Sequence, residues 1–306
     1  MKNLFIVILI SLYSFSVKGQ DIFESIEYPY SVKKVSLSNG QEIAFMDEGE
    51  GETLIFVHGL GSYGPAWKKN VEELSKHYRC IAVDLLGYGK SSKPEETYLL
   101  KDQARVIQEL VQNLGLSEIH LVGHSMGGQI AIHVGLAYPE IVKSLILVAP
   151  AGIETFTDQQ KAFFEMISPE AIAASSDQEI ESNLKRNFYS YTDDARFMID
   201  DRIVIKDDPE FPRYAAMVVN GIRGMVRQPV ADLLGSLKIP VLVLFGANDD
   251  LIPNKLLNPH LTTEAVAASA KKMIPDVKVN LIPAAGHMLM FEQAIEVNRF
   301  IREFVK

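Results

Sequence analysis

The most informative segment of the chain runs Ile119-His120-Leu121-Val122-Gly123-His124-Ser125-Met126-Gly127-Gly128. Its first four residues are typical of a buried β-strand, and an apolar helical pattern extends from Met126 to Ala137. Between the two, residues 123–127 match G-x-S-x-G, a sharp turn that exposes a serine hydroxyl at the carboxyl end of a strand. Glycines on either side leave out the Cβ atoms that such a strained turn would not accommodate. The segment therefore predicts a strand, an exposed Ser125 and a helix, in that order.

The same alternation of strand and helix patterns continues on both sides of this segment. Short apolar, β-branched runs predict buried strands at residues 53–57, 79–83, 143–148, 241–245 and 277–282. Apolar residues at helical spacing predict helices at residues 66–77, 99–114, 262–273 and 291–305. A hairpin precedes them, with strands at 33–37 and 42–46 and a turn at Ser38-Asn39-Gly40. This order predicts an α/β fold with a mostly parallel, doubly wound sheet.

The alternation is interrupted once, between residues 151 and 236. This region is helical in pattern, rich in charge, and contains scattered aromatic residues such as Phe156, Phe188 and Tyr191. We interpret it as a helical cap, residues 151–236, inserted into an α/β core of residues 20–150 and 237–306. The aromatic side chains either line a substrate pocket or pack the cap onto the sheet, and packing is the more frequent role of any single one.

Residues 1–19 have the pattern of a secretory signal peptide. Lys2 supplies a positive charge, residues 4–15 form an apolar run, and Val17-Lys18-Gly19 provides a small-residue cleavage site. The run is short for a bilayer span, although a retained anchor is the alternative interpretation. We therefore expect a secreted or periplasmic protein with no stable membrane insertion.

The net charge indicates which partners are expected, and the cysteine content indicates whether a disulfide can form. The chain has a formal net charge of −9, which loss of Lys2 and Lys18 makes more negative still, so nucleic acid is not expected as a partner. The single cysteine, Cys80, excludes an intrachain disulfide and is expected to be buried in its strand. A chain of 306 residues can instead bury a large apolar core.

A serine hydroxyl needs a neighbouring base, and that base needs a third group to fix its tautomer. In folds with this turn the acid and then the histidine follow the serine in the chain. Two histidines fit that order, His260 and His287. His287 is favoured because it lies in a loop beside Gly286 directly after the last predicted strand, whereas His260 precedes a predicted helix.

The acid is expected at the end of the preceding strand, where Asp249 and Asp250 follow Gly246. One buried carboxylate is enough to hold the imidazole, so the other aspartate is interpreted as a solvated or turn-forming residue. The spacing from Gly246 favours Asp249, but the residues alone leave Asp250 open.

Backbone amides are the expected partners of the negative charge that develops on the substrate oxygen. The predicted strand 53–57 ends in His58-Gly59-Leu60-Gly61, a loop able to turn an N–H group toward Ser125. The amides of Leu60 and Met126 are the predicted oxyanion hole. His58 is interpreted as a structural residue that holds this loop.

Four motifs together resemble the α/β-hydrolase fold family over nearly the whole chain. They are residues 57–61, the D-x-x-G-x-G-x-S loop at 84–91, the turn at 123–128, and Ala285-Gly286-His287. The resemblance implies a Ser125–His287–Asp249 triad, because Gly246-x-x-Asp249-x-x-x-Pro253 is similar to the acid turn of the family. It implies no metal or organic cofactor.

Within this family, a chain with serine at the turn resembles carboxylesterases and lipases. Epoxide hydrolases and dehalogenases carry an aspartate at that position. Ring-cleavage C–C hydrolases typically have Asn in place of His124 and often Trp in place of Met288. We therefore expect a small, apolar carboxylic ester as the substrate. Cleavage of a lactone or a C–C bond on the same triad remains an alternative, as does a non-catalytic relative that only binds ligands.

Overall fold

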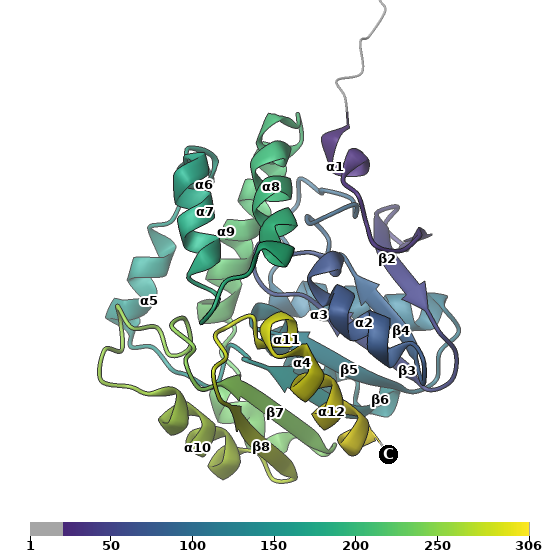
Figure 1. Ribbon diagram of the computed structural model, residues 1–306, viewed down its shortest axis with the longest axis vertical. Coiled ribbons are helices and arrows are strands. Elements are labelled where there is room, and N and C mark those ends of the chain that lie inside the picture. The colour runs from purple at the N-terminus through teal and green to yellow at the C-terminus, as the bar shows by residue number, and fades with distance from the viewer. Residues whose placement is uncertain (1–20, 306) are drawn as a thin grey trace, which may run out of the picture.

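A single twisted sheet organises the molecule, as the computed structural model shows for residues 21–305 (Figure 1). The strand order is β1-β2-β4-β3-β5-β6-β7-β8. The strands are β1 (Val32–Ser36), β2 (Glu42–Glu48), β3 (Thr53–Val57), β4 (Arg79–Val83), β5 (Ile119–His124), β6 (Val142–Val148), β7 (Val241–Gly246) and β8 (Val277–Ile282). Neighbouring strands from β4 to β8 are parallel, and β2 pairs antiparallel with both β1 and β4. The predicted α/β class and mostly parallel sheet are confirmed.

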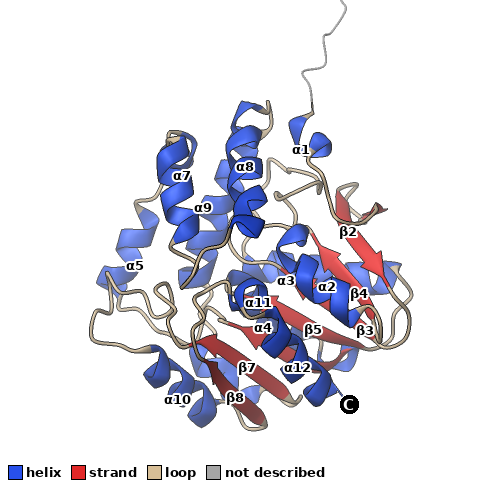
Figure 2. Ribbon diagram, in the orientation of Figure 1, coloured by secondary structure: helices blue, strands red, loops and turns tan. Residues whose placement is uncertain are grey.

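Helices cover both faces of the sheet, as expected for parallel strands joined by crossovers (Figure 2). On one face α2 (Lys68–Leu74), α11 (Leu289–Glu292) and α12 (Ala294–Val305) pack together. The other face carries α3 (Leu100–Asn113) and α4 (Met126–Ala137), which contact each other. Helix α10 (Thr263–Met273) packs against β7 and β8.

Two predicted helices differ from the structure. Residues 66–77 do not form one helix: a 3₁₀ helix, Gly64–Trp67, precedes the shorter α2, because the backbone of Trp67 (φ −92°, ψ 6°) leaves α-helical angles between them. Residues 291–305 are interrupted at Gln293, which leaves helical backbone angles (φ −119°, ψ 45°) between α11 and α12. The Gln293 side-chain amide donates a hydrogen bond to the carbonyl of Ala284 (2.9 Å) and so ties this break to the loop after β8.

Between β6 and β7 the chain forms a group of helices over the carboxyl ends of the central strands (Figure 1). They are α5 (Asp158–Glu165), α6 (Pro169–Ala173), α7 (Asp177–Lys185), α8 (Arg196–Val204) and α9 (Phe211–Arg227). Capping boxes start two of them: Thr157 and Gln160 at α5, and Ser176 and Glu179 at α7. Helix α9 contacts α3 and α4, so the group rests on the sheet domain through its longest helix.

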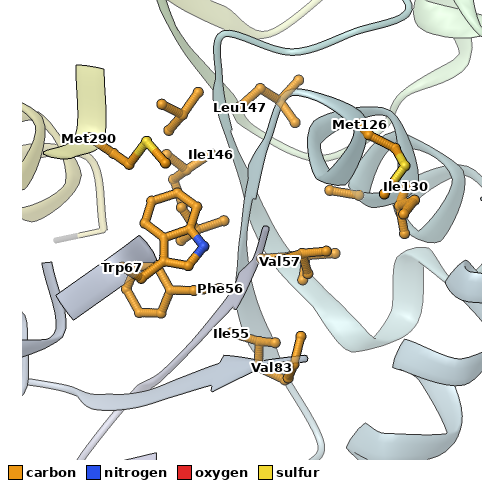
Figure 3. Close-up of a cluster of buried hydrophobic side chains, with 14 of the residues drawn as sticks. Ile55, Phe56, Val57, Trp67, Val83, Met126, Ile130, Ile146, Leu147 and Met290 are labelled. Atoms are coloured by element: carbon orange, nitrogen blue, oxygen red, sulfur yellow. The ribbon is translucent and has the colours of Figure 1, made fainter. Parts of the chain in front are cut away.

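A dense apolar cluster lies between the sheet and the helices (Figure 3). Phe56, Trp67 and Ile146 are fully buried, and the Phe56 and Trp67 rings lie 5.2 Å apart. Cys80 is buried as a free thiol in β4, and burial raises its pKa to about 12. This packing fixes the positions of β3 and β5, whose ends carry the residues of the candidate site.

The predicted signal peptide, residues 1–19, lies outside the described residues. Among the residues that the structure describes, no helix combines the length and the apolar character needed to cross a bilayer.

Candidate active site

Ser125 occupies a strained turn between β5 and α4. Its backbone has φ 53° and ψ −119°, a positive φ that is uncommon for a residue with a side chain. The neighbouring chain holds this conformation: the Ser125 N–H donates to the carbonyl of Val148 (3.0 Å), and the Ser125 carbonyl accepts from the N–H groups of Gly128 (2.9 Å) and Ala151 (3.0 Å). Such strain persists only where surrounding contacts impose it.

The glycines around Ser125 are required by space. A Cβ atom on Gly123 would lie 2.4 Å from the carbonyl oxygen of Gly127, and one on Gly127 would lie 2.4 Å from the carbonyl oxygen of His58. Both obstacles are backbone atoms, which cannot move aside as a flexible side chain can. The absence of these Cβ atoms lets the start of α4 pack directly on the loop after β3.

His287 and Asp249 form a buried pair on adjacent loops at the carboxyl ends of β8 and β7. His287 Nδ1 lies 2.8 Å from Asp249 Oδ2, so Nδ1 carries a proton and Nε2 is left for another partner. The other carboxylate oxygen accepts from the N–H groups of Leu251 (2.8 Å) and Ile252 (3.0 Å), which fixes its orientation. Asp249 is 2% exposed and His287 4%.

The two alternatives from the sequence are placed elsewhere. Asp250 and His260 are both exposed, and neither lines a cavity with Ser125. The structure thus brings together Asp249 and His287, the residues favoured by chain order and spacing.

Ser125 and His287 face two cavities. The first, of about 260 Å³, extends toward α8 and α9, and we call it the α8 cavity. The second, of about 540 Å³, extends toward α5, and we call it the α5 cavity. Leu60, Asn183 and Asn187 line both. Ser125 and His287 therefore form part of the wall of both cavities.

The two residues predicted to form the oxyanion hole lie near Ser125, one in the loop after β3 and one at the start of α4. Leu60 lines both cavities, and Met126 is the first residue of α4, where an N–H has no acceptor within the helix. His58 Nε2 accepts a hydrogen bond from the N–H of Leu85 (3.1 Å), so its Nδ1 donates to the carbonyl of Gly59 (2.8 Å). Burial lowers the pKa of His58 to about 4, which keeps the ring neutral and agrees with a structural role.

His124 contributes to the site in a way that the sequence did not predict. Its Nε2 lies 2.9 Å from the carbonyl oxygen of His287, and because a carbonyl only accepts, Nε2 carries the proton. The two rings are 4.7 Å apart. Burial, together with the nearby His287 and His58, holds the pKa of His124 well below its usual value. His124 is thus a neutral donor that fixes the main chain of His287.

Further bonds tie the His287 loop to the inserted helices. Glu292 accepts from the N–H groups of Gly286 (2.8 Å) and Tyr189 (3.2 Å), and the Met288 N–H donates to the carbonyl of Asn187 (2.9 Å).

The position of His124 inside the G-x-S-x-G motif was a signal that could have suggested a role for it. Glu292 and Asn187 belong to no motif, and only the folded chain brings them to the loop.

Comparisons with known proteins agree with this arrangement. The family model of the alpha/beta hydrolase fold matches residues 52–294. The chain is 29% identical to lipase 1 of Psychrobacter immobilis, over 85% of this chain and 80% of the lipase. It is 26% identical to a 2-hydroxy-6-oxo-6-(2'-aminophenyl)hexa-2,4-dienoic acid hydrolase of Metapseudomonas resinovorans, over 90% of this chain and 91% of that enzyme.

A third relative is longer than this chain. It is the dihydrolipoyllysine-residue acetyltransferase component of an acetoin cleaving system of Pseudomonas putida, which is 30% identical over 84% of this chain. The match covers 65% of that relative, so the chain spans less than two thirds of its length.

Replacing Gly127 tests the close packing at the turn. We expect Gly127→Ala to lower the free energy of unfolding by about 1–3 kcal/mol or more, because the new Cβ would overlap backbone atoms. Gly235→Ala is the matched control, since the nearest atom would be 3.7 Å away, and it should change stability little. Urea unfolding followed by circular dichroism measures both. Equal stability of the two variants would contradict the packing argument.

Buried neutral histidines should make stability depend on pH. Burial lowers the pKa of His133 from 6.5 to about 4, so the unfolded chain binds the extra proton first as pH falls. The contribution of His133 is complete above pH 6.5 and is lost as the pH falls toward 4.

His133→Gln should therefore flatten the slope of unfolding free energy against pH between these values, by at most about 1.4 kcal/mol per pH unit. His77→Gln, at an exposed position, serves as the control and should leave the slope unchanged. Urea midpoints measured at half-unit pH steps give both slopes. An identical slope in His133→Gln and the wild type would refute the assignment.

Proposed function

Because this chain belongs to the α/β-hydrolase fold family, we propose that it is a serine hydrolase that cleaves carboxylic esters through an acyl-enzyme intermediate. The observation that carries the proposal is that His287, which is hydrogen-bonded to the buried Asp249, lines the same two cavities as the strained Ser125. Nucleophilic catalysis by serine requires a histidine beside the serine and a carboxylate that holds the histidine. The residues that line these cavities provide this combination.

In the proposed mechanism His287 Nε2 takes the proton of the Ser125 hydroxyl as the oxygen attacks the ester carbonyl. Asp249 holds the imidazole with Nδ1 protonated and stabilises the positive charge that develops on it. His287 then gives its proton to the departing alcohol, and an acyl-serine remains. Water, activated by the same imidazole, attacks the acyl carbon, and the acid leaves as Ser125 regains its proton.

We assign the oxyanion hole to the backbone N–H groups of Leu60 and Met126. In such a hole each donor contributes about 3–4 kcal/mol to stabilising the tetrahedral intermediate. Mutation of these side chains would leave the N–H groups in place, so the assignment rests on the backbone of the β3 loop and of the first residue of α4.

The two cavities suggest how the two halves of an ester are accommodated. The α8 cavity has a largely apolar wall that includes Met198, Ile205 and Val218. The α5 cavity adds Glu154 and Lys161 to its apolar residues. We propose that an apolar acyl or alcohol group occupies the α8 cavity, while the other half of the substrate lies in the larger α5 cavity.

Variants of the three residues test the proposal on a p-nitrophenyl ester of butyrate. Ser125→Ala and His287→Ala should lower kcat/KM by more than about a thousandfold while far-UV circular dichroism stays unchanged. Asp249→Asn should lower it about as strongly, because the imidazole would lose its anionic partner and its tautomer.

Asp250→Asn is the matched control and should keep wild-type activity, since Asp250 is exposed. A fluorophosphonate probe should label the wild type and not Ser125→Ala. Full ester hydrolysis by Ser125→Ala would end the proposal. A screen that includes a lactone and a vinylogous 1,5-diketone substrate separates an esterase from a lactonase and from a C–C hydrolase.

We further propose that the protein is exported. The support is the charge, apolar run and small-residue site of residues 1–19. Expression in a bacterial host followed by fractionation should place the protein outside the inner membrane, with a mass lower than that of the whole chain. Recovery from the cytosol at full mass would contradict export.

A further inference from the structure

The first described residues of the chain are packed against the candidate active site rather than against the sheet. Asp21 caps the short helix α1 (Ile22–Ser25), which lies near α8 and the group of inserted helices (Figure 1). Phe23 is 2% exposed and Ile26 7%, values typical of core residues. A terminal segment is usually exposed unless specific contacts hold it.

Asp208 attaches this segment to the inserted helices. One carboxylate oxygen of Asp208 accepts hydrogen bonds from the backbone N–H groups of Ile22 (2.7 Å) and Phe23 (3.2 Å). The other accepts from the N–H of Glu210 (2.7 Å), which fixes the carboxylate just before α9. Asp208 is itself 5% exposed, so these charge-assisted bonds are shielded from water.

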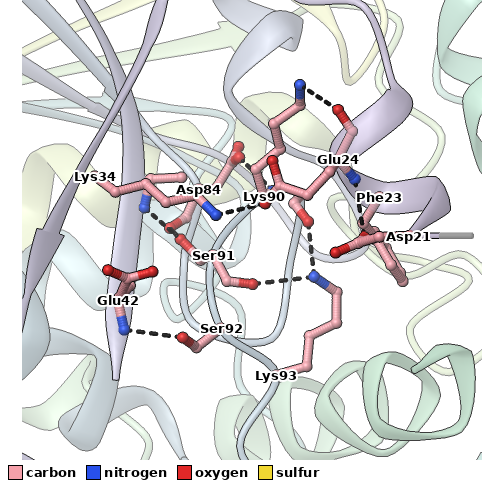
Figure 4. Close-up of polar contacts among 12 residues, drawn as sticks. Asp21, Phe23, Glu24, Lys34, Glu42, Asp84, Lys90, Ser91, Ser92 and Lys93 are labelled. Carbon is pink, nitrogen blue, oxygen red and sulfur yellow. Dashed lines mark hydrogen bonds and ion pairs between the residues drawn. The ribbon is translucent and has the colours of Figure 1, made fainter. Parts of the chain in front are cut away.

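The loop after β4 holds the same segment from the core side (Figure 4). Lys90 Nζ donates to the carbonyl of Glu24 (2.9 Å). Lys93 donates to the carbonyls of Gly89 (2.8 Å) and Ser91 (3.0 Å), and its Nζ lies 3.7 Å from the centre of the Phe23 ring. The Phe23 ring is thus held over a buried ammonium group on one side.

The other neighbour of Phe23 belongs to the substrate cavity. Its ring lies 5.9 Å from that of Tyr214 on α9, and both residues line the α8 cavity. Ile26 lines the same cavity, together with Ser125 and His287. The segment 21–26 therefore lies between the inserted helices and the core and contributes apolar surface to a cavity that both of them form.

We propose that residues 21–26, held by Asp208, form an end wall of the α8 cavity and limit the length of the apolar group that it accepts, so that Phe23 and Ile26 determine chain-length specificity. The proposal rests on the proposed ester hydrolysis, because it names the determinant of substrate choice at that site. Neither residue takes part in bond breaking. Their effect is on which substrates reach a productive position over Ser125.

The test compares kcat/KM for p-nitrophenyl butyrate and p-nitrophenyl decanoate. Phe23→Ala and Ile26→Ala should raise the decanoate-to-butyrate ratio, the first by about tenfold or more, because hydrophobic pockets discriminate by this factor for small differences in size. Asp208→Ala should shift the ratio in the same direction, although Asp208 does not line the cavity. Phe163→Ala is the matched control, since Phe163 is 44% exposed and lines neither cavity.

Calorimetry gives the ratio of the dissociation constants of butyrate and decanoate, a second measure of chain-length preference that does not require turnover. If the wild-type protein hydrolyses neither ester, the proposed function is contradicted. The ratio of the two binding constants, compared between variants and wild type, would then test whether residues 21–26 limit the length of the bound chain. An unchanged ratio in folded Phe23→Ala and Ile26→Ala would overturn the wall. If Phe23→Ala does not fold, the test uses Ile26→Ala and the milder Phe23→Leu. An unchanged decanoate-to-butyrate ratio in both of these variants would likewise overturn the proposed wall.

Discussion

The main chain at Ser125 has to pass from the end of β5 into α4 within one residue, and the other features of the site are arranged around this turn. The positive φ of Ser125 is unfavourable for the residue on its own. It is maintained because the carbonyl of Val148 in β6 accepts from the Ser125 N–H, because the N–H of Ala151 donates to the Ser125 carbonyl, and because the glycines on either side allow close backbone contact. The same close approach brings the loop after β3 to both cavities, which Leu60 lines.

A second constraint is the electrostatic environment of the histidine rings near Ser125. His58, His124 and His287 lie close together near one serine, and two of these rings have their pKa lowered by burial. Neutral His58 and His124 each use a ring N–H to hold a backbone carbonyl, so they shape the loops without adding positive charge. Of these three rings, only that of His287 is hydrogen-bonded to a carboxylate, the one of Asp249.

Sequence patterns located most of the fold because apolar periodicity is a local property. The predicted strand 53–57 matches β3, and the predicted strand 277–282 matches β8. The break at Gln293 was not predicted, because it depends on a hydrogen bond to Ala284 in a different loop. Pairing order is likewise non-local: that β4 lies between β2 and β3 follows from packing across the sheet, which no run of residues encodes.

The candidate site shows the same division. Ser125, Asp249 and His287 could be selected because each lies in the turn or loop that follows a strand, and parallel strands bring their carboxyl ends to one edge. The cavity could not be predicted, because its wall combines segments separated by most of the chain: Phe23 from the first described helix, Tyr214 from α9 and Met288 from the loop after β8. Each of these positions is set by different partners, so a change in Asp208 or Glu292 can alter the cavity without touching the serine, histidine or aspartate. Such a construction allows substrate preference to diverge while the turn at Ser125 stays the same.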